Sequence, residues 1–401
     1  MGSRYTDKVV IVGGGIHGVS IAYYLSKRGC PSVIVERSHI AAAASGKSGG
    51  FLAREWGSGP TVQLHHRSYD MHAELARDLK LASYRPIETL SVAMRSGGWS
   101  DERYQASWLA GRMDVSSIDS VTAQVTPLEL TMKMLNAAVS GGCEVILDSV
   151  VGVLTEGSDG APESHPSVVG VTLAAGGELK SSKVVFAMGP WTGALLESWL
   201  LGIQFPMEGI KSTSFVYENL NELKEPSDSF ACFCDEDVNS CHLELYPRPN
   251  GDMYVCGCGG SDHVSGSRLL QGGDCEHADL IMADEGRVEA SLKSFRQMTN
   301  FSSLKANPDK TQACMRPCPP DGLPVMSPIC GYSGAFVSAG HNCWGILWAP
   351  ISGLAMAELI LDGHCASVDL SSFSLARFNN EEKGISKRGR KKVAVAIGEQ
   401  W

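Results

Sequence analysis

The segment from residue 9 to residue 18, VVIVGGGIHG, limits the possible folds of this chain more than any other. Its four aliphatic residues indicate a buried strand, and Gly13, Gly15 and Gly18 follow with the spacing G-x-G-x-x-G. We expect Gly13 to permit a tight turn, Gly15 to leave room for a pyrophosphate, and Gly18 to let a following helix pack closely. A glycine turn without a ligand has the same local pattern, so the neighbouring elements must decide between the two.

The residues after the glycines continue the pattern of a nucleotide-binding unit. Apolar spacing predicts a helix over 16–29, and SVIVE at 32–36 predicts a second buried strand that ends in Glu36. A strand, a helix and a strand within about thirty residues form a βαβ unit with parallel strands. The helix N-terminus then faces phosphates, and Glu36 is placed to accept hydrogen bonds from ribose hydroxyls, which disfavours NADP. The motif by itself does not separate NAD from FAD.

Buried strands and helices like those of the βαβ unit return later in the chain, after a region with a different pattern. From about residue 205 the sequence changes to alternating strands with turn residues between them, and at 331–363 a strand, a glycine-rich loop and a long helix follow. We therefore predict an α/β fold in which a discontinuous Rossmann-type nucleotide-binding domain carries an inserted antiparallel-sheet substrate domain. The expected boundaries are 1–85, 125–204 and 325–375 for the nucleotide-binding domain, 86–124 and 205–324 for the substrate domain, and 376–401 for a polar, basic tail.

The composition excludes several classes of protein. The net charge of −10 argues against a nucleic-acid partner, and no stretch approaches the roughly 18–20 uninterrupted apolar residues of a transmembrane segment. The thirteen cysteines are odd in number and scattered, which indicates reduced thiols rather than a secreted disulfide framework. Because we see neither a signal peptide nor an SKL-type peroxisomal signal, we expect an intracellular, cytoplasmic protein. The oligomeric state does not follow from the sequence.

Further helices are predicted from residue 62 to about residue 79, from Pro127 to about residue 140, and over 278–299. The first of these carries His65, His66 and His72. Its spacing indicates a surface helix, so we expect these three histidines on a partly exposed face.

Three short patterns give weaker evidence about lipidation, an anionic partner and metal binding. The start MGSRYT fits a myristoylation signal at Gly2, but it is also a common leader. The tail segment KRGRKK fits an anionic partner or, more simply, a solvated end of the chain. The pairs Cys232/Cys234 and Cys256/Cys258 have C-x-C spacing on predicted strands, whereas zinc prefers C-x-x-C, so we expect no metal.

Two distant segments identify a family. AAAASGKSGG (41–50) follows the second strand directly, and SAGHNCWG (338–345) leads from a strand into the long helix. With VVIVGGGIHG, they resemble the D-amino-acid oxidase-like superfamily of FAD-dependent oxidoreductases, which includes glycine oxidase and sarcosine oxidase. The resemblance covers roughly 8–365 and implies FAD as the cofactor of the Rossmann-type domain. It implies FAD contacts at Gly13, Gly15, Ile16, Gly18, Glu36, Arg37, Ser45, Gly46, Ser48, Gly49, Gly50, Val151 (through its backbone, at the adenine), Ala187, Gly189, Trp191, Gly340, His341, Asn342, Cys343, Trp344, Gly345 and Ile346.

The segment CMRPCPPD (314–321) resembles the family's stretch beside the reactive edge of the flavin. Arg316 takes the position of an arginine that often grips the substrate carboxylate; a structural ion pair is the alternative. Cys314 takes the position at which the sarcosine oxidase branch binds FAD covalently, and a free buried cysteine is the alternative. Tyr246, on a strand of the inserted sheet, is either a substrate contact or a core tyrosine. His341 is expected to shape the flavin loop.

The resemblance and Arg316 together imply an enzyme that oxidises the carbon–nitrogen bond of an amino acid or a secondary, possibly cyclic, amine to an imine. Oxygen is the expected electron acceptor and hydrogen peroxide the expected product. One alternative is a dehydrogenase on the same fold that passes electrons to a quinone or a carrier protein. A second alternative is a flavin-binding assembly or trafficking factor with little turnover.

Overall fold

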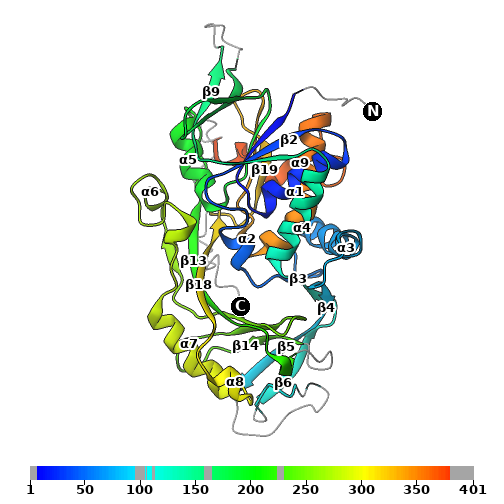
Figure 1. Cartoon of the computed structure of the whole chain (residues 1–401), viewed down its shortest axis with the longest axis vertical. Coiled ribbons are helices and arrows are strands. Elements are labelled where there is room, and N and C mark those ends of the chain that lie inside the picture. Colours follow the sequence, from blue (N-terminus) through cyan, green and yellow to red (C-terminus); the bar gives the residue numbers. More distant parts are fainter. Residues whose placement is uncertain are drawn as a thin grey trace, which may run out of the picture.

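The computed structural model describes residues 7–94, 104, 106–110, 113–157, 165–223 and 230–379. Two large sheets lie one beyond the other along the longest axis of the molecule, with helices packed around them (Figure 1). The α/β fold with an added antiparallel sheet is therefore as predicted. The myristoylation signal at Gly2 and the KRGRKK tail lie outside the described residues.

The first sheet has six strands and contains the βαβ unit. Five of its strands are parallel, and only the edge strand β19 runs antiparallel to its neighbour β20. A parallel sheet buried on both faces needs nearly continuous aliphatic strands, and VVIV and SVIVE supply them. In sheet order the strands are β19 (Val325–Pro328), β20 (Ala335–Ala339), β12 (Val184–Phe186), β1 (Val9–Val12), β2 (Ser32–Glu36) and β8 (Glu144–Leu147).

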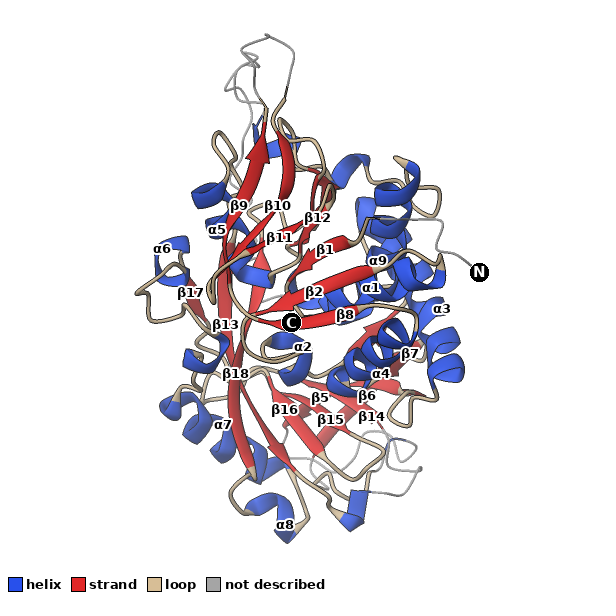
Figure 2. Ribbon diagram, turned by 45° about the horizontal axis from the view of Figure 1, so that its top comes forward, coloured by secondary structure: helices blue, strands red, loops and turns tan. Residues whose placement is uncertain are grey.

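The second sheet has eight strands and covers the other end of the cavity described below. Its two longest strands, β13 and β18, pair along nearly their whole length and stand side by side in Figure 2. All its pairings are antiparallel except that of β14 with β5. In order the strands are β17 (Asp262–Val264), β13 (Glu208–Tyr217), β16 (Met253–Cys256), β15 (Glu244–Pro247), β14 (Phe230–Cys234), β5 (Glu88–Met94) and β6 (Met113–Asp119), while β18 (Lys310–Cys318) pairs with β13.

Two three-stranded sheets complete the strand structure. One is a meander of β9 (Val150–Glu156), β10 (Ser167–Leu173) and β11 (Glu178–Lys180). The other joins β3 (Phe51–Ala53), β7 (Thr122–Gln124) and β4 (Arg85–Pro86). In the sheet of β3, β7 and β4, strand β3 of the predicted nucleotide-binding domain pairs with β7 of the predicted substrate domain. The domain boundaries themselves stay a prediction.

The helices occupy most of the positions that the sequence indicated. The predicted helices over 16–29, over 62 to about 79 and from residue 127 to about 140 are α1, α3 and α4. The helical stretch predicted over 278–299 is shorter, because the carboxylate of Asp284 caps α7 by accepting from the amide of Arg287. The helices are α1 (Ile16–Lys27), α2 (Ala44–Lys47), α3 (Val62–Leu79), α4 (Pro127–Ser140), α5 (Thr192–Trp199), α6 (Gly266–Leu269), α7 (Glu285–Met298), α8 (Ser302–Lys305), α9 (Gly345–Asp362) and α10 (Ala376–Asn379).

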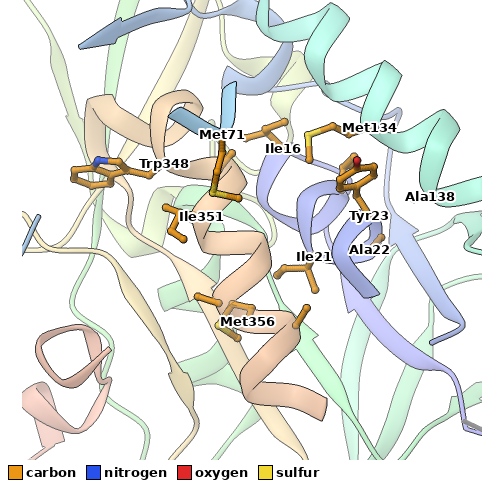
Figure 3. Packing of buried hydrophobic residues seen from close by; sticks show 14 of the residues in the cluster. Ile16, Ile21, Ala22, Tyr23, Met71, Met134, Ala138, Trp348, Ile351 and Met356 are labelled. Atoms are coloured by element: carbon orange, nitrogen blue, oxygen red, sulfur yellow. The ribbon is translucent and has the colours of Figure 1, made fainter. Parts of the chain in front are cut away.

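Helices α1 and α9 pack closely on one face of the first sheet. The Ser20 hydroxyl of α1 donates to the carbonyl oxygen of Ala349 in α9 at 2.8 Å. A Cβ at Gly353 would lie 2.2 Å from the Ser20 hydroxyl oxygen, so only glycine allows this approach. Figure 3 shows the apolar side chains that fill the rest of this contact, among them Ile21 of α1 and Ile351 of α9.

Pro350 interrupts the hydrogen-bond ladder inside α9, and α3 compensates for the loss. A proline has no N–H, so the carbonyl oxygen of Ile346 loses its helical partner. The Nε2–H of His72 donates to this oxygen at 3.1 Å and to that of Leu347 at 3.0 Å. The amide of Ile351 donates to the hydroxyl oxygen of Ser68. The buried polar side chains of α3 therefore replace hydrogen bonds that α9 cannot make for itself.

This repair corrects the expectation for the histidines of α3. His65 and His72 are buried, and only His66 lies on the partly exposed face. His65 Nδ1 lies 2.8 Å from the carbonyl oxygen of Ala53 and donates to it. The helix period identified a surface helix, but it could not show that the second face packs against a helix nearly three hundred residues away.

The segment Asn342–Asp362 is long and apolar enough to span a membrane, but 67% of its apolar stretch is buried inside the described structure. It packs against α1 and α3, so it serves as the central helix of the core. Among the described residues no other helix reaches that length and hydropathy.

Burial of His72 makes the stability of the protein depend on pH. Burial lowers the pKa of its imidazole from 6.5 to about 4. The unfolded chain binds this proton below about pH 6.5 and the folded chain does not, so the free energy of unfolding falls as the pH drops from 6.5 towards 4. The full shift corresponds to about 3 kcal/mol. We expect His72→Gln, which keeps an N–H donor but cannot titrate, to flatten urea-unfolding stability between pH 6.5 and 4.5.

Ser68→Ala is the matched control for this prediction, because it removes a hydrogen bond to α9 without removing a titrating group. It should lower stability by about 1 kcal/mol at every pH and leave the slope unchanged. An unchanged slope in His72→Gln would contradict the assignment.

Candidate functional site

One large cavity lies between the two sheets. Its volume is about 830 Å³, within the range of roughly 300–1,000 Å³ that small-molecule sites occupy. One wall is formed at the carboxyl ends of β1, β2 and β12, where doubly wound sheets bind their ligands. The opposite wall is the face of the second sheet formed by β13, β15, β16 and β18.

The glycine motif shapes the first wall. Gly13 has a φ of +111°, and a Cβ there would lie 2.5 Å from the carbonyl oxygen of Ala187. A Cβ at Gly18 would lie 2.0 Å from the carbonyl oxygen of Gly13, so Gly18 lets α1 approach β1. Gly15 differs from both, because a Cβ there would meet only the Ser45 hydroxyl oxygen, at 3.2 Å, while facing the cavity. The geometry therefore separates two glycines needed for packing from one that keeps space open.

Glu36 is held firmly at the end of β2. One carboxylate oxygen accepts from the amide of Gly14 at 2.7 Å, and the other accepts from the amide of Ser38 at 3.0 Å. Arg37 lies over the ring of Trp191 at 4.8 Å, and burial lowers the pKa of its guanidinium. All three side chains line the cavity. They form a polar end suited to the ribose and adenine of a nucleotide.

A second helix N-terminus reaches the same cavity. The short 3₁₀ turn η7 (Asn342–Trp344) leads directly into α9, whose first residues line the cavity. The ring of His341, just before this turn, stacks on the ring of His17 from α1, with centroids 3.5 Å apart. Burial lowers the pKa of His17 to about 3 and holds the pKa of His341 well below its usual value. Both imidazoles are therefore neutral, so they act here as packing and polar groups.

Nearly all of the site residues expected from the sequence meet in this cavity. Gly46 and Gly340 do not line it: a Cβ would lie 2.3 Å from the carbonyl oxygen of Ala41 in the first case and 2.6 Å from Pro319 Cγ in the second. Gly18 also lies behind the wall. The expected residues that do line it are Gly13, Gly15, Ile16, Glu36, Arg37, Ser45, Ser48, Gly49, Gly50, Val151, Ala187, Gly189, Trp191, Tyr246, Cys314, Arg316, His341, Asn342, Cys343, Trp344, Gly345 and Ile346.

Cys314 and Arg316 lie two residues apart on β18, so both face the cavity. An Nη of Arg316 donates to the Ser212 hydroxyl at 3.1 Å, and its Nε is buried without a hydrogen-bond partner. Among the described residues no carboxylate forms an ion pair with Arg316, so the structural ion pair weighed from the sequence is not present in that part of the chain. Burial raises the pKa of the Cys314 thiol, although the charges of Arg316 and Lys47 oppose this rise.

Glu244 is a cavity-lining residue that the sequence analysis did not identify. The hydroxyl of Tyr246 donates to its Oε2 at 2.5 Å, and the thiol of Cys256 donates to the same oxygen at 3.4 Å. Burial, and then the charge of Glu244, holds the pKa of Tyr246 well above its usual value, so the tyrosine stays protonated and can donate. Since side chains two apart on a strand share a face, the prediction for Tyr246 could have included Glu244.

Aromatic rings surround this end of the cavity. Phe51 contacts Trp56, Phe233 and Tyr246, with ring centroids 5.2, 5.1 and 5.8 Å apart respectively. Trp344 lies edge-on to Trp56. All five side chains line the cavity, so they exclude water from the region that also contains Arg316 and Glu244.

The cysteines are unpaired and hold no cluster of metal ligands. All thirteen are free thiols. Within the described ranges, no group of three or more His, Cys, Asp or Glu side chains is arranged to hold a metal ion. Cys343 is exposed to the cavity, and burial of the surrounding region raises its pKa to about 11.

The residues present fit a flavin dinucleotide. The open space at Gly15 sits at the N-terminus of α1, where a pyrophosphate binds favourably. The Ser48 hydroxyl and His341 Nδ1 are buried without partners among the described residues, and both residues line the cavity. These features fit the expected cofactor along the cavity from Glu36 to α9.

Comparison with known proteins supports the same cofactor. A family model described as FAD dependent oxidoreductase (DAO) matches residues 8–359. A Schizosaccharomyces pombe protein that is named as an oxidoreductase, with no substrate given in its name, is 27% identical over 90% of this chain and 96% of its own. Glycine oxidase of Pseudomonas aeruginosa is 24% identical over 88% and 95% of the two chains. The structure of glycine oxidase from Geobacillus kaustophilus superposes with a TM-score of 0.72 at 20% identity, covering 95% and 99%.

Gly15 and Gly18 give a matched test of the cradle. We expect Gly15→Ala to fold normally, because its φ of −75° suits alanine, but to bind flavin at least tenfold more weakly. Gly18→Ala should destabilise the apoprotein itself, because its Cβ would collide with backbone. Flavin content after gel filtration and thermal unfolding of the apoproteins measure the two effects. Equal flavin content in Gly15→Ala and the parent would contradict the assignment.

Proposed function

The chain belongs to the family of FAD-dependent oxidoreductases, and from this we propose that it oxidises the carbon–nitrogen bond of an amino acid or a secondary, possibly cyclic, amine. FAD is its cofactor, and the enzyme is of the amine and amino-acid oxidase type. The proposed products are an imine and hydrogen peroxide, with O2 as the acceptor. The observation that carries this proposal is Arg316, a guanidinium without an ion-pair partner among the described residues, in the cavity that fits the cofactor.

Arg316 is suited to hold a substrate carboxylate. Its planar guanidinium presents N–H donors in a fork that matches both oxygens of a carboxylate. Ser212 takes one donor, and the remaining donors can face a ligand. The hydrogen bond to Ser212 also limits rotation of the guanidinium, so the substrate would be oriented as well as bound.

The aromatic wall supports the proposed reaction by excluding water. Phe51, Trp56, Phe233 and Trp344 present aromatic ring surface to the end of the cavity proposed for the substrate. When bound, FAD accepts the two electrons that leave the carbon–nitrogen bond. The substrate amine must be neutral for this step, and the low-dielectric wall favours its uncharged form. The two protons and two electrons lost by the substrate end on O2 as hydrogen peroxide.

Val151 and Trp191 line the cavity at the end where Glu36 lies, which supports the proposal that this end holds the adenine nucleotide. The opposite end, with Arg316 and Tyr246, then receives the substrate. Tyr246 donates to Glu244, so we propose that its ring, rather than its hydroxyl, contacts the substrate.

An anaerobic screen tests the function as a whole. Mixing the holoenzyme with a panel of amino acids and amines should bleach the oxidised flavin band for the true substrate class. Peroxide formed in one-to-one ratio with substrate under air would support O2 as the acceptor, whereas bleaching without peroxide would indicate a dehydrogenase. Persistence of oxidised flavin with every compound would favour an assembly or trafficking factor.

Arg316 gives a sharper prediction. Arg316→Ala should raise KM for a carboxylate substrate by roughly 100-fold or more, because a charge-assisted bidentate contact is lost. Arg316→Lys keeps the charge without the forked donors, so its KM should lie between those of the parent and of Arg316→Ala. Amines without a carboxylate should show little change. An unchanged KM for amino acids in Arg316→Ala would exclude this role.

Cys314 is proposed as the site of a thioether bond to FAD, in which an S–C bond would replace the S–H bond of the thiol and one C–H bond of the 8α-methyl group, and the two electrons and two protons released would pass to O2 as hydrogen peroxide. Acid precipitation of the parent should then leave the yellow colour in the pellet. Cys314→Ser should release it to the supernatant, whereas Cys343→Ser, which changes another cavity-lining thiol, should not. Release of all flavin from the parent would refute the covalent bond without affecting the proposed reaction.

A further inference from the structure

Two opposite charges face the substrate end of the cavity without neutralising each other. Glu244 on β15 and Arg316 on β18 both line it. Neither forms an ion pair with any described residue. Both nevertheless act on the thiols of Cys256 and Cys343: in each case burial is the main cause of a raised pKa, the Glu244 charge adds to the rise and the Arg316 charge opposes it. The two charged groups therefore face the same region.

Unpaired charges beside an aromatic wall are costly unless a ligand supplies their partners. Arg316 is proposed to bind the substrate carboxylate. A cationic group of the ligand would be the partner of Glu244, whose carboxylate is already held in place. The Tyr246 hydroxyl and the Cys256 thiol both hydrogen-bond to Oε2, and no described residue donates to Oε1. Glu244 thus presents one oriented, unoccupied oxygen to the cavity.

The sheet register gives the spacing of the two charges. Glu244 pairs with Cys256, and β15 is three strands from β18 in the order β18–β13–β16–β15, or roughly 14 Å across. When the strand pairings are extended by one residue, Gln312 of β18 lies in the same row across the sheet as Glu244. Arg316 lies four residues from Gln312 along β18, which is roughly 13 Å from that row. Even after both long side chains reach into the cavity, on the order of 10 Å separates the charges.

That spacing is too long for the amine and carboxylate of one α-amino acid, which are joined through a single carbon and lie about 2.5 Å apart. The reacting amine must also be neutral, and a fixed carboxylate beside it would favour its charged form. The cation that Glu244 binds is therefore a second one, several bonds from the carboxylate that Arg316 binds.

We propose that Glu244 is a specificity-determining residue that binds the cationic side chain of a basic amino acid whose carboxylate is held by Arg316. This inference rests on the proposed function, since it names the substrate class of the same site. The aromatic rings of Tyr246 and Phe51 flank this position and add a favourable surface for the alkyl part and the cation of such a side chain.

Pairs of compounds that differ only in the side-chain charge test the inference. The holoenzyme is titrated with lysine and norleucine, and with arginine and citrulline, in both enantiomers. Perturbation of the visible flavin spectrum reports binding, and anaerobic bleaching reports reaction. We expect the parent to favour the cationic member of each pair by at least tenfold. Glu244→Gln, which keeps an oxygen acceptor for Tyr246, should lose that preference and bind the neutral member at least as tightly as before.

Tyr246→Phe is the matched control, because it removes the hydroxyl and leaves the Glu244 charge. It should retain the preference for the cationic member, whatever its effect on rate. Equal affinity of the parent for both members of each pair, or an unchanged preference in Glu244→Gln, would overturn the inference and leave the proposed function standing if neutral amino acids bleach the flavin. Failure of every amino acid and every secondary amine to perturb or bleach the flavin would overturn both.

Discussion

The close crossing of α1 and α9 is the constraint on which the rest of the structure depends. Gly353 and Ser20 bring the two helices into contact, and the Ser20 hydroxyl bonds to the backbone of α9. As a result, the N-termini of both helices open into one cavity, with His17 of α1 stacked on His341, which precedes the turn into α9. One N-terminus is suited to the pyrophosphate of FAD, and the other brings a second positive dipole end to the same cavity. A wider crossing would separate these two ends and divide the site.

The same helix α9 shows how a local weakness is tolerated when tertiary contacts satisfy it. Pro350 leaves the carbonyl of Ile346 without a helical donor, and His72 supplies one from α3. A neutral imidazole can do this in a buried site without burying a charge. The helix nearest to the flavin loop is therefore held by side chains of another element as well as by its own backbone.

The sequence predicted those features that depend on local pattern. The βαβ unit, α3 and α4 were all found from periodicity, and the glycine spacing identified the cofactor-binding wall. Features that depend on distant partners were missed: His65 and His72 are buried because α9 covers them. Glu244 was overlooked although it shares a strand face with Tyr246, because an isolated glutamate on an alternating strand usually faces water. That Arg316 has no ion-pair partner among the described residues could be learned only from three dimensions.

The cofactor cavity draws on residues from Val12 to Ile346, and this has a consequence for how the protein is made. A ribosome adds about 5–20 residues each second, so Gly345 emerges roughly 15 seconds to a minute after the first glycines of the motif. During roughly the first half of that interval β1 lacks its neighbour β12, and throughout it α1 lacks the helix that covers it. The nascent chain therefore has no complete FAD site until Ile346 has been made, so flavin loading follows synthesis of the start of α9, and the apolar face of α1 stays uncovered by α9 until then.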